Sequence, residues 1–189
     1  MRNYLTGIAT ATLIFGGLAV AGLAVVFFLM PDPPNIHRTS IYDITLPKGW
    51  TCKLEGTETV CNPEGPPPYR AQLIGAAKYL NPKMDTLDAY TTHLAKPKTS
   101  MPPDGATMTS TVERVTRTVI DGRTWVDATH LNSELRGYRT RYLAALTVQV
   151  AILITFSSYK DDFDIYQPMF EGMVRSINIY QRLNEAAKS

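Results

Sequence analysis

The feature that most constrains this chain is a long uncharged run near its N-terminus. From Leu5 to Met30 no residue is charged, and threonine is the only polar residue type. As a helix that rises about 1.5 Å per residue, the run would span roughly 39 Å, against about 30 Å for the hydrocarbon core of a bilayer. Residues 1–30 are therefore predicted to form a transmembrane anchor that crosses with some tilt.

A cleaved secretory signal is the alternative interpretation of the same residues. Signal peptides have an apolar core of about 7–15 residues that ends at a small-residue cleavage site. This run is longer, and it ends in the bulky residues Phe27–Met30. Both its length and its ending favour an anchor that is retained.

One face of the predicted anchor carries small residues at helical spacing, namely Thr10, Gly17, Ala21 and Ala24. Small side chains let two membrane helices approach closely, which is how such helices associate within lipid. We expect this face to pack against a helix of another membrane protein. The alternative is an ordinary lipid-facing helix, because Gly and Ala are common in any membrane span.

The rest of the chain is nearly neutral. The 189 residues include 19 Lys and Arg against 17 Asp and Glu, and Arg2 is the only charged residue of the first thirty, so the remainder carries a net charge of +1. Nucleic-acid-binding domains usually show a large basic excess, and nucleic acid is not an expected partner. Residues 31–39 are predicted to be a proline-rich linker, residues 40–180 a folded domain and residues 181–189 a polar tail.

The two cysteines lie in a predicted hairpin. Gly56-Thr57 suits a two-residue type II′ turn, which takes glycine first. The strands would then place Cys52 opposite Cys61 with Cα atoms about 4.5 Å apart, which a disulfide can bridge. Disulfides are typical of oxidising compartments. We therefore expect a single-pass membrane protein with its N-terminus in the cytoplasm and its domain outside the cytoplasm.

The alternative for the cysteines is two unrelated free thiols in a cytosolic domain. A zinc site is not expected, because two thiols lack the further ligands that tetrahedral zinc requires.

Periodicity predicts the other elements. The most apolar segment after the anchor, residues 148–156, is expected to be the central strand of a sheet. Asp85 is predicted to cap a helix over residues 84–94, and Pro168 to kink or delay a helix over 162–175. Asp121-Gly122 predicts a type I′ hairpin turn. The expected strands are residues 41–46, 71–80, 108–120, 123–131, 138–147, 148–156 and 176–180, beside the hairpin over 50–61.

The sequence contains no phosphate-binding Gly-rich loop, no Gly-x-Ser-x-Gly elbow and no His-x-x-x-His metal pair. No catalytic, cofactor-binding or metal-binding residue is therefore predicted. One row of side chains could handle protons, because the hairpins would place Glu113 and Arg139 on either side of His130. A solvated cross-strand charge ladder is the simpler interpretation of this row. Asp127 is interpreted as a polar residue on the face of the sheet.

Two proline-rich loops, residues 62–68 and 96–105, are expected at the edge of a partner surface near the membrane, because long loops often bind partners. Tyr69 is expected to be exposed, and the candidate interface residues are Pro66, Pro67, Pro68 and Tyr69. The alternative is that both loops are solvent-exposed connectors.

Three motifs, Ile44–Trp50 (ITLPKGW), Ile120–Trp125 (IDGRTW) and Val174–Ile177 (VRSI), are similar to those of the PsbP-like family. Over about residues 40–180 the chain resembles this family, including its DcrB-like branch. The resemblance implies an α+β fold, an antiparallel sheet with helices on its faces in an α/β/α sandwich. It also implies a non-enzymatic accessory or assembly subunit of a bacterial inner-membrane protein complex, with the domain in the periplasm. The alternative function is a membrane-tethered envelope protein that binds a small molecule or lipid.

Overall fold

The structure is a computed structural model that describes residues 33–101 and 105–180. The predicted anchor, with its face of Thr10, Gly17, Ala21 and Ala24, and the predicted tail lie outside these residues. Within the described ranges, no helix has the length and apolarity needed to span a bilayer. The described residues from Asn35 onward pack as one compact unit.

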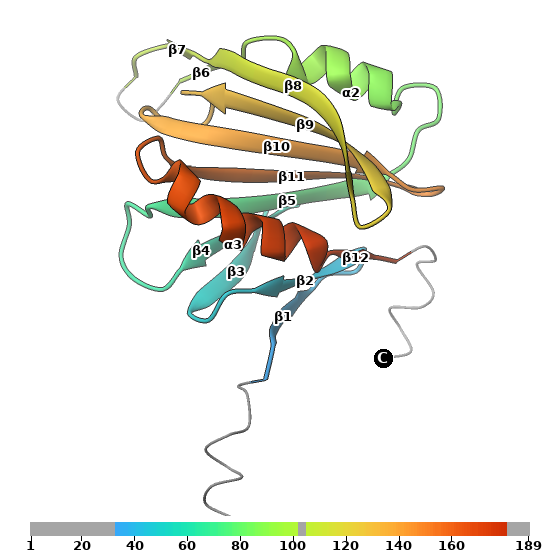
Figure 1. The fold of residues 1–189 in the computed structure, drawn as a ribbon, viewed down its shortest axis with the longest axis horizontal. Coiled ribbons are helices and arrows are strands. Elements are labelled where there is room, and N and C mark those ends of the chain that lie inside the picture. The colour runs from blue at the N-terminus through green and yellow to red at the C-terminus, as the bar shows by residue number, and fades with distance from the viewer. Residues whose placement is uncertain (1–32, 102–104, 181–189) are drawn as a thin grey trace, which may run out of the picture. The chain divides into compact units, whose positions relative to one another are not determined.

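Seven antiparallel strands form the main sheet, in the order β3-β4-β5-β11-β10-β9-β8 (Figure 1). The apolar segment after residue 148 is the central strand, as predicted, and nearly all of its residues are buried because it has three strands on each side. The strands are β3 (Trp50–Glu55), β4 (Glu58–Pro63), β5 (Ala71–Tyr79), β8 (Thr111–Ile120), β9 (Arg123–Leu131), β10 (Tyr138–Leu146) and β11 (Val150–Tyr159).

Turn chemistry sets two of the hairpins. Gly56 has a φ of 62°, as the first position of a type II′ turn requires, and Asp121 and Gly122 have φ values of 50° and 73°, as in a type I′ turn. Cys52 pairs with Cys61 across β3 and β4, and a disulfide joins them with Cα atoms 4.0 Å apart. The predicted turns and the predicted disulfide are therefore confirmed.

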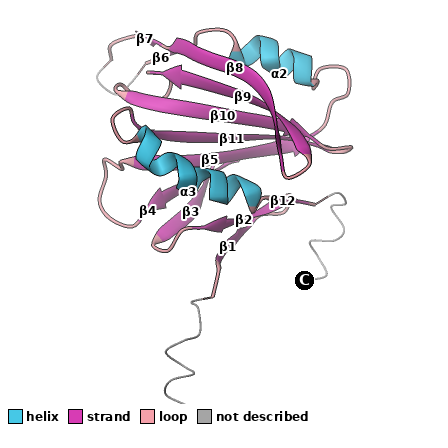
Figure 2. Cartoon of the chain, in the orientation of Figure 1, coloured by secondary structure: helices cyan, strands magenta, loops and turns pink. Residues whose placement is uncertain are grey.

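The two described helices pack on opposite faces of the sheet (Figure 2). They are α2 (Leu87–Leu94) and α3 (Phe163–Arg175). The prediction that Asp85 caps α2 is wrong, because the Thr86 hydroxyl accepts the N–H of Ala89 at 3.0 Å. Asp85 instead accepts the N–H of Asn81. α3 begins at Phe163 and continues through Pro168, so its start is not delayed.

The larger part of the core lies between the sheet and α3, where Phe156 of β11 stacks on Phe170 with ring centroids 4.4 Å apart. A smaller core lies under α2. Its buried members are Leu94, Val126, Ala128, Tyr142 and Ala144. The fold is thus α+β with helices on both sheet faces.

A small sheet of β1 (Asn35–Arg38), β2 (Tyr42–Leu46) and β12 (Asn178–Ile179) packs on the α3 side of the main sheet. Residues 96–105, predicted to be a loop, contain β6 (Thr99–Ser100), which pairs with β7 (Met108–Thr109).

Candidate functional site

The predicted row of Glu113, His130 and Arg139 does not form. A β-bulge between Val112 and Arg114 removes Glu113 from the ladder, so Val112 lies opposite His130. On the other side Thr140 lies opposite His130, one residue away from the predicted register. A slip of one residue moves a side chain to the other face of a sheet. Arg139 therefore pairs with Glu113, with 2.8 Å between Nε and Oε2, and neither contacts His130.

His130 is buried, and both of its ring nitrogens form hydrogen bonds within the fold. Its Nε2–H donates to the carbonyl of Leu94 at 2.8 Å, and its Nδ1 accepts the Ser110 hydroxyl at 3.1 Å. The same hydroxyl oxygen accepts the N–H of Lys98 at 2.8 Å. Burial lowers the pKa of His130, so the neutral ring is the form that fits. The ring thereby ties the end of α2 and the chain around β7 to β9.

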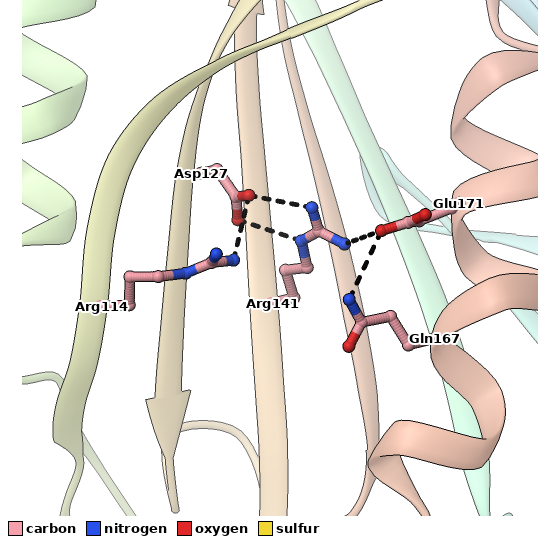
Figure 3. Close-up of polar contacts among 5 residues, drawn as sticks. All are labelled: Arg114, Asp127, Arg141, Gln167 and Glu171. Carbon is pink, nitrogen blue, oxygen red and sulfur yellow. Dashed lines mark hydrogen bonds and ion pairs between the residues drawn. The ribbon is translucent and has the colours of Figure 1, made fainter.

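Asp127 lies at the centre of a buried ionic cluster (Figure 3). It is 2 % exposed, and it accepts Nε and Nη2 of Arg141 at 3.0 and 2.9 Å and Nη2 of Arg114 at 3.1 Å. Nη1 of Arg141 reaches Glu171 of α3 at 3.3 Å, and Gln167 donates to the same carboxylate. The cluster therefore connects β8, β9 and β10 to α3.

The charges of this cluster satisfy one another. Burial opposes the charge of Arg141, but Asp127 and Glu171 outweigh it and raise the pKa of the guanidinium. The interpretation of Asp127 as an ordinary polar residue of the sheet face missed this arrangement. Because every charged member has a partner of opposite sign, the cluster stabilises the packing of α3 and offers no free group for chemistry.

A different surface has the features of a binding site. α2 covers β8, β9 and β10, but on the same face of the sheet no described helix covers β5, β4 and β3. We call this surface the open sheet face. Its residues are Thr51, Lys53 and Glu55 of β3, Val60 and Asn62 of β4, and Gln72, Ile74, Ala76 and Lys78 of β5.

Three hollows follow one another along the open sheet face. The first, of about 390 Å³, is mainly polar and is lined by β3, β4 and the loop that follows, including Tyr69. The second, of about 360 Å³, is mainly apolar, with Ala76, Ala151 and Leu153 among its lining residues. The third, of about 280 Å³, lies beside α2 and shares Lys78 and Tyr90 with the second. The surface thus combines an apolar centre with polar ends.

The ionisable groups at the α2 end of this surface are paired. Lys78 Nζ lies 2.8 Å from Asp85, and the hydroxyl of Tyr90 donates to the same carboxylate at 3.1 Å. Lys78 and the N–H of Asn81 lower the pKa of Asp85, whereas burial and the Asp85 charge raise the pKa of Tyr90 to about 12. Among the described residues, no group of three or more His, Cys, Asp or Glu side chains could hold a metal ion. The arrangement suits binding by shape and hydrogen bonds.

Of the candidate interface residues, Pro66, Pro67 and Pro68 are exposed as predicted. Tyr69 is half-buried, which contradicts the prediction that it is exposed. Its carbonyl accepts the hydroxyl of Tyr138 at 2.6 Å, and its side chain lines the first hollow. The loop residues thus border the open sheet face, and their contact with a partner stays a prediction.

Along this surface, sequence reasoning named Tyr69 and the loop of residues 62–68, but no residue of β5. The signal it missed is the asymmetry of β5. Residues 71, 73 and 75 face α3 and are fully buried, whereas Gln72, Ile74 and Ala76 on the other face are only half-buried. When a strand next to the central strand carries both polar and apolar residues on one face, that face is expected to have no helix over it.

No protein-family model and no curated protein matches the sequence. Among solved structures, PsbP (CyanoP) from Synechocystis sp. PCC 6803 matches with a TM-score of 0.55 at 11% identity, over 80% of this chain and 95% of that one. A protein from Bacteroides thetaiotaomicron matches with a TM-score of 0.53 at 10% identity, over 75% of this chain. The match covers 46% of the Bacteroides chain, so the present chain spans less than half of that protein. At this level of identity the likeness concerns the fold, and the domain from Asn35 onward has the PsbP-like fold that its motifs indicated. The prediction of a linker over residues 31–39 is wrong for Asn35–Arg38, which form β1 and pair with β2.

Proposed function

We propose that this protein is a non-enzymatic accessory subunit of a bacterial inner-membrane complex, and that its open sheet face binds another subunit. The observation that carries this proposal is the absence of a described helix over β3, β4 and β5, on a face that α2 covers elsewhere. Residues 1–30 would anchor the chain, and the Cys52–Cys61 disulfide favours an oxidising compartment for the domain.

The chemistry of the surface supports a protein partner. Protein interfaces commonly have an apolar core and a polar rim. Here Ala76 and Leu153 line the apolar second hollow at the centre, and the polar Lys53 and Gln72 line the first hollow at the rim. The rigid sheet keeps these side chains in place, so that little conformational entropy is lost on binding.

A photo-reactive amino acid at Gln72, in the full chain within its native membrane, tests this proposal. We expect it to cross-link to one other protein that also co-purifies in mild detergent. The matched control is the same residue at Thr116, which is exposed on the opposite face. Equal yields of cross-linked product at the two positions, or purification as a lone monomer, would contradict the proposal.

The apolar second hollow favours a second candidate function, the tethered binding of a small molecule or lipid. Under this alternative, native mass spectrometry of the purified chain would show a bound lipophilic molecule and no second protein. Ala76→Phe would fill the hollow and remove that molecule, whereas Thr116→Phe on the other face would not.

A further inference from the structure

β3 is an outermost strand of the main sheet, and part of its backbone has no partner strand (Figure 1). The two-residue turn makes Glu55 and Glu58 a hydrogen-bonded pair, and such pairs alternate along an antiparallel ladder. Lys53 and Glu55 therefore direct their N–H and C=O groups to β4. The same groups of Cys52 and Leu54 point outward, where no described strand lies.

The opposite edge of the sheet is protected. β8 has a bulge at Glu113, and its charged side chains are held in ion pairs. Glu113 pairs with Arg139, Arg114 with Asp127, and Arg117 with Asp88. Bulges and charges are the usual devices that prevent an edge from pairing with another chain. β3 has no bulge, and Leu54, one of its residues whose N–H and C=O point outward, is 75 % exposed.

The exposed segment Lys53-Leu54-Glu55 is complementary to itself. If two copies of β3 lie antiparallel with Leu54 opposite Leu54, each Lys53 lies opposite Glu55 of the second copy. Opposite charges facing each other across strands stabilise pairing, and like charges destabilise it. The neighbouring register, centred on Lys53, would place the two ammonium groups against each other. Charge therefore selects one register.

We propose that two copies of this chain pair through their β3 edges about a two-fold axis at Leu54. The N–H and C=O of each Leu54 would then bond to those of the other, as the alternation of the ladder requires. Lys53 and Glu55 lie on the same face of β3, so the open sheet faces of the two copies would join into one continuous surface. The pairing is isologous, with the same residues contributed by each copy.

A second copy fits this edge better than an unrelated strand. When two Lys-Leu-Glu segments run antiparallel, each positive charge faces a negative one. The contact is short, so we expect it to be weak between free domains. Tethering two chains to one membrane raises their effective concentration and strengthens such contacts. The inference does not depend on the partner of the open sheet face.

Carbodiimide cross-linking of the full chain in liposomes tests the pairing. This reagent joins a lysine to a carboxylate only when the two are in contact. A mixture of isotope-labelled and unlabelled chains distinguishes products between copies from products within one copy. We expect a mixed peptide that links Lys53 of one copy to Glu55 of the other.

Charge exchange supplies the matched variants. Lys53→Glu alone and Glu55→Lys alone should each lose the product between copies, because like charges then face each other and no amine lies opposite a carboxylate. A mixture of the two variants should recover it as a mixed pair. The intact Cys52–Cys61 disulfide checks that each variant is folded. Leu54→Pro, which removes the outward N–H, should also abolish self-pairing, whereas Leu54→Ala should retain more of it.

Two results would overturn the proposal. One is the absence of a product between wild-type copies in liposomes while a product within single copies forms. The other is a product between copies that Leu54→Pro forms as readily as the wild-type chain, which would mean that the β3 backbones do not pair.

Discussion

At the scale of single residues, the ion pair of Asp127 and Arg141 differs from the other ion pairs of the described residues because both of its side chains are buried. Both side chains are less than one-tenth exposed, and two hydrogen bonds join them. Removing one member of a buried pair leaves an uncompensated charge in a region from which water is excluded. The carboxylate of Asp127 therefore matters for the stability of the fold, although it has no role in any reaction.

Asp127→Asn should lower the free energy of unfolding by about 3–5 kcal/mol, because Arg141 and Arg114 lose the charge that they share. Asp88→Asn is the control, since Asp88 is 90% exposed in its pair with Arg117 and its loss should change stability little. The measurement is urea unfolding of the full chain in detergent, followed by the fluorescence of the buried residues Trp50 and Trp125. Similar losses for the two variants would argue against a structural role for the cluster.

His130 predicts how stability depends on pH. Burial lowers its pKa below the ordinary value of 6.5, with Lys98 acting in the same direction and Glu134 and Glu113 opposing it. The unfolded chain therefore binds the proton more readily than the folded one. The contribution of His130 is complete above pH 6.5 and is lost as the pH falls toward the lowered pKa, by at most about 1.4 kcal/mol per pH unit.

The same unfolding experiment between pH 7.5 and about pH 5 checks this expectation. His130→Gln should be less stable at the higher pH, because Leu94 and Ser110 lose their partner, but its stability should vary less with pH. His37→Gln, in β1, should reduce the pH dependence less, because His37 is only half-buried, although burial lowers its pKa as well. A wild-type slope retained by His130→Gln would assign the effect to another group.

Residue partners were harder to predict than turns, for a physical reason. The turn at 121–122 sets the β8–β9 register only as far as Arg114, where the bulge shifts it. Asn132, at a φ of 59°, lengthens the next turn and pairs Leu131 with Arg139. Each shift is one residue, and neither is indicated by a sequence motif as clear as the Asp-Gly of a hairpin turn. The predicted row around His130 failed for that reason, and the partner of Asp127 could not be found.

At the scale of elements, the sequence of a turn was sufficient to predict a hairpin wherever that turn alone set the register of its two strands. Gly56 and the pair Asp121-Gly122 set their hairpins, and the apolar run after residue 148 identified the central strand. The cap of α2 was misassigned because Asp85 and Thr86 are both good capping residues. Only the tertiary contacts of Asp85, with Lys78 and Tyr90, remove it from the helix.

The disulfide should stabilise the β3–β4 hairpin beyond what its ladder supplies. Replacing both Cys52 and Cys61 with Ala should cost about 2–3 kcal/mol, the value for closing a loop of this length in the unfolded chain. Amide hydrogen exchange should become faster in β3 and β4, while the β8–β9 hairpin serves as an internal control. Unchanged exchange in β3 would mean that packing alone holds this edge.

At the scale of the whole molecule, the small sheet and the main sheet meet at Gly75. A Cβ atom at this position would lie 2.0 Å from the hydroxyl oxygen of Tyr42 and 3.0 Å from Cζ of its ring. Tyr42 is 2 % exposed and belongs to β2, so it has little room to move. The absence of a side chain at one residue thus permits the two sheets to dock.

Gly75→Ala should therefore destabilise the domain by about 1–3 kcal/mol, the usual cost of overpacking a core. In the background of Tyr42→Phe, which removes the hydroxyl, the same change should cost less. Urea unfolding of the four chains that make up this double-mutant cycle measures the coupling. Equal costs in the two backgrounds would show that the two residues do not interact.

The pairing of β12 with β2 has a consequence for the timing of synthesis. β2 is among the first strands of the domain to be made, yet Asn178 and Ile179 pair with it, and Tyr180 donates its N–H to Ile41 at 2.8 Å. A nascent chain that has not yet emerged to residue 180 keeps one edge of β2 without its partner. Residues 178–180 therefore close the domain late in synthesis, and until then this edge of β2 stays open to any protein that recognises an unpaired strand.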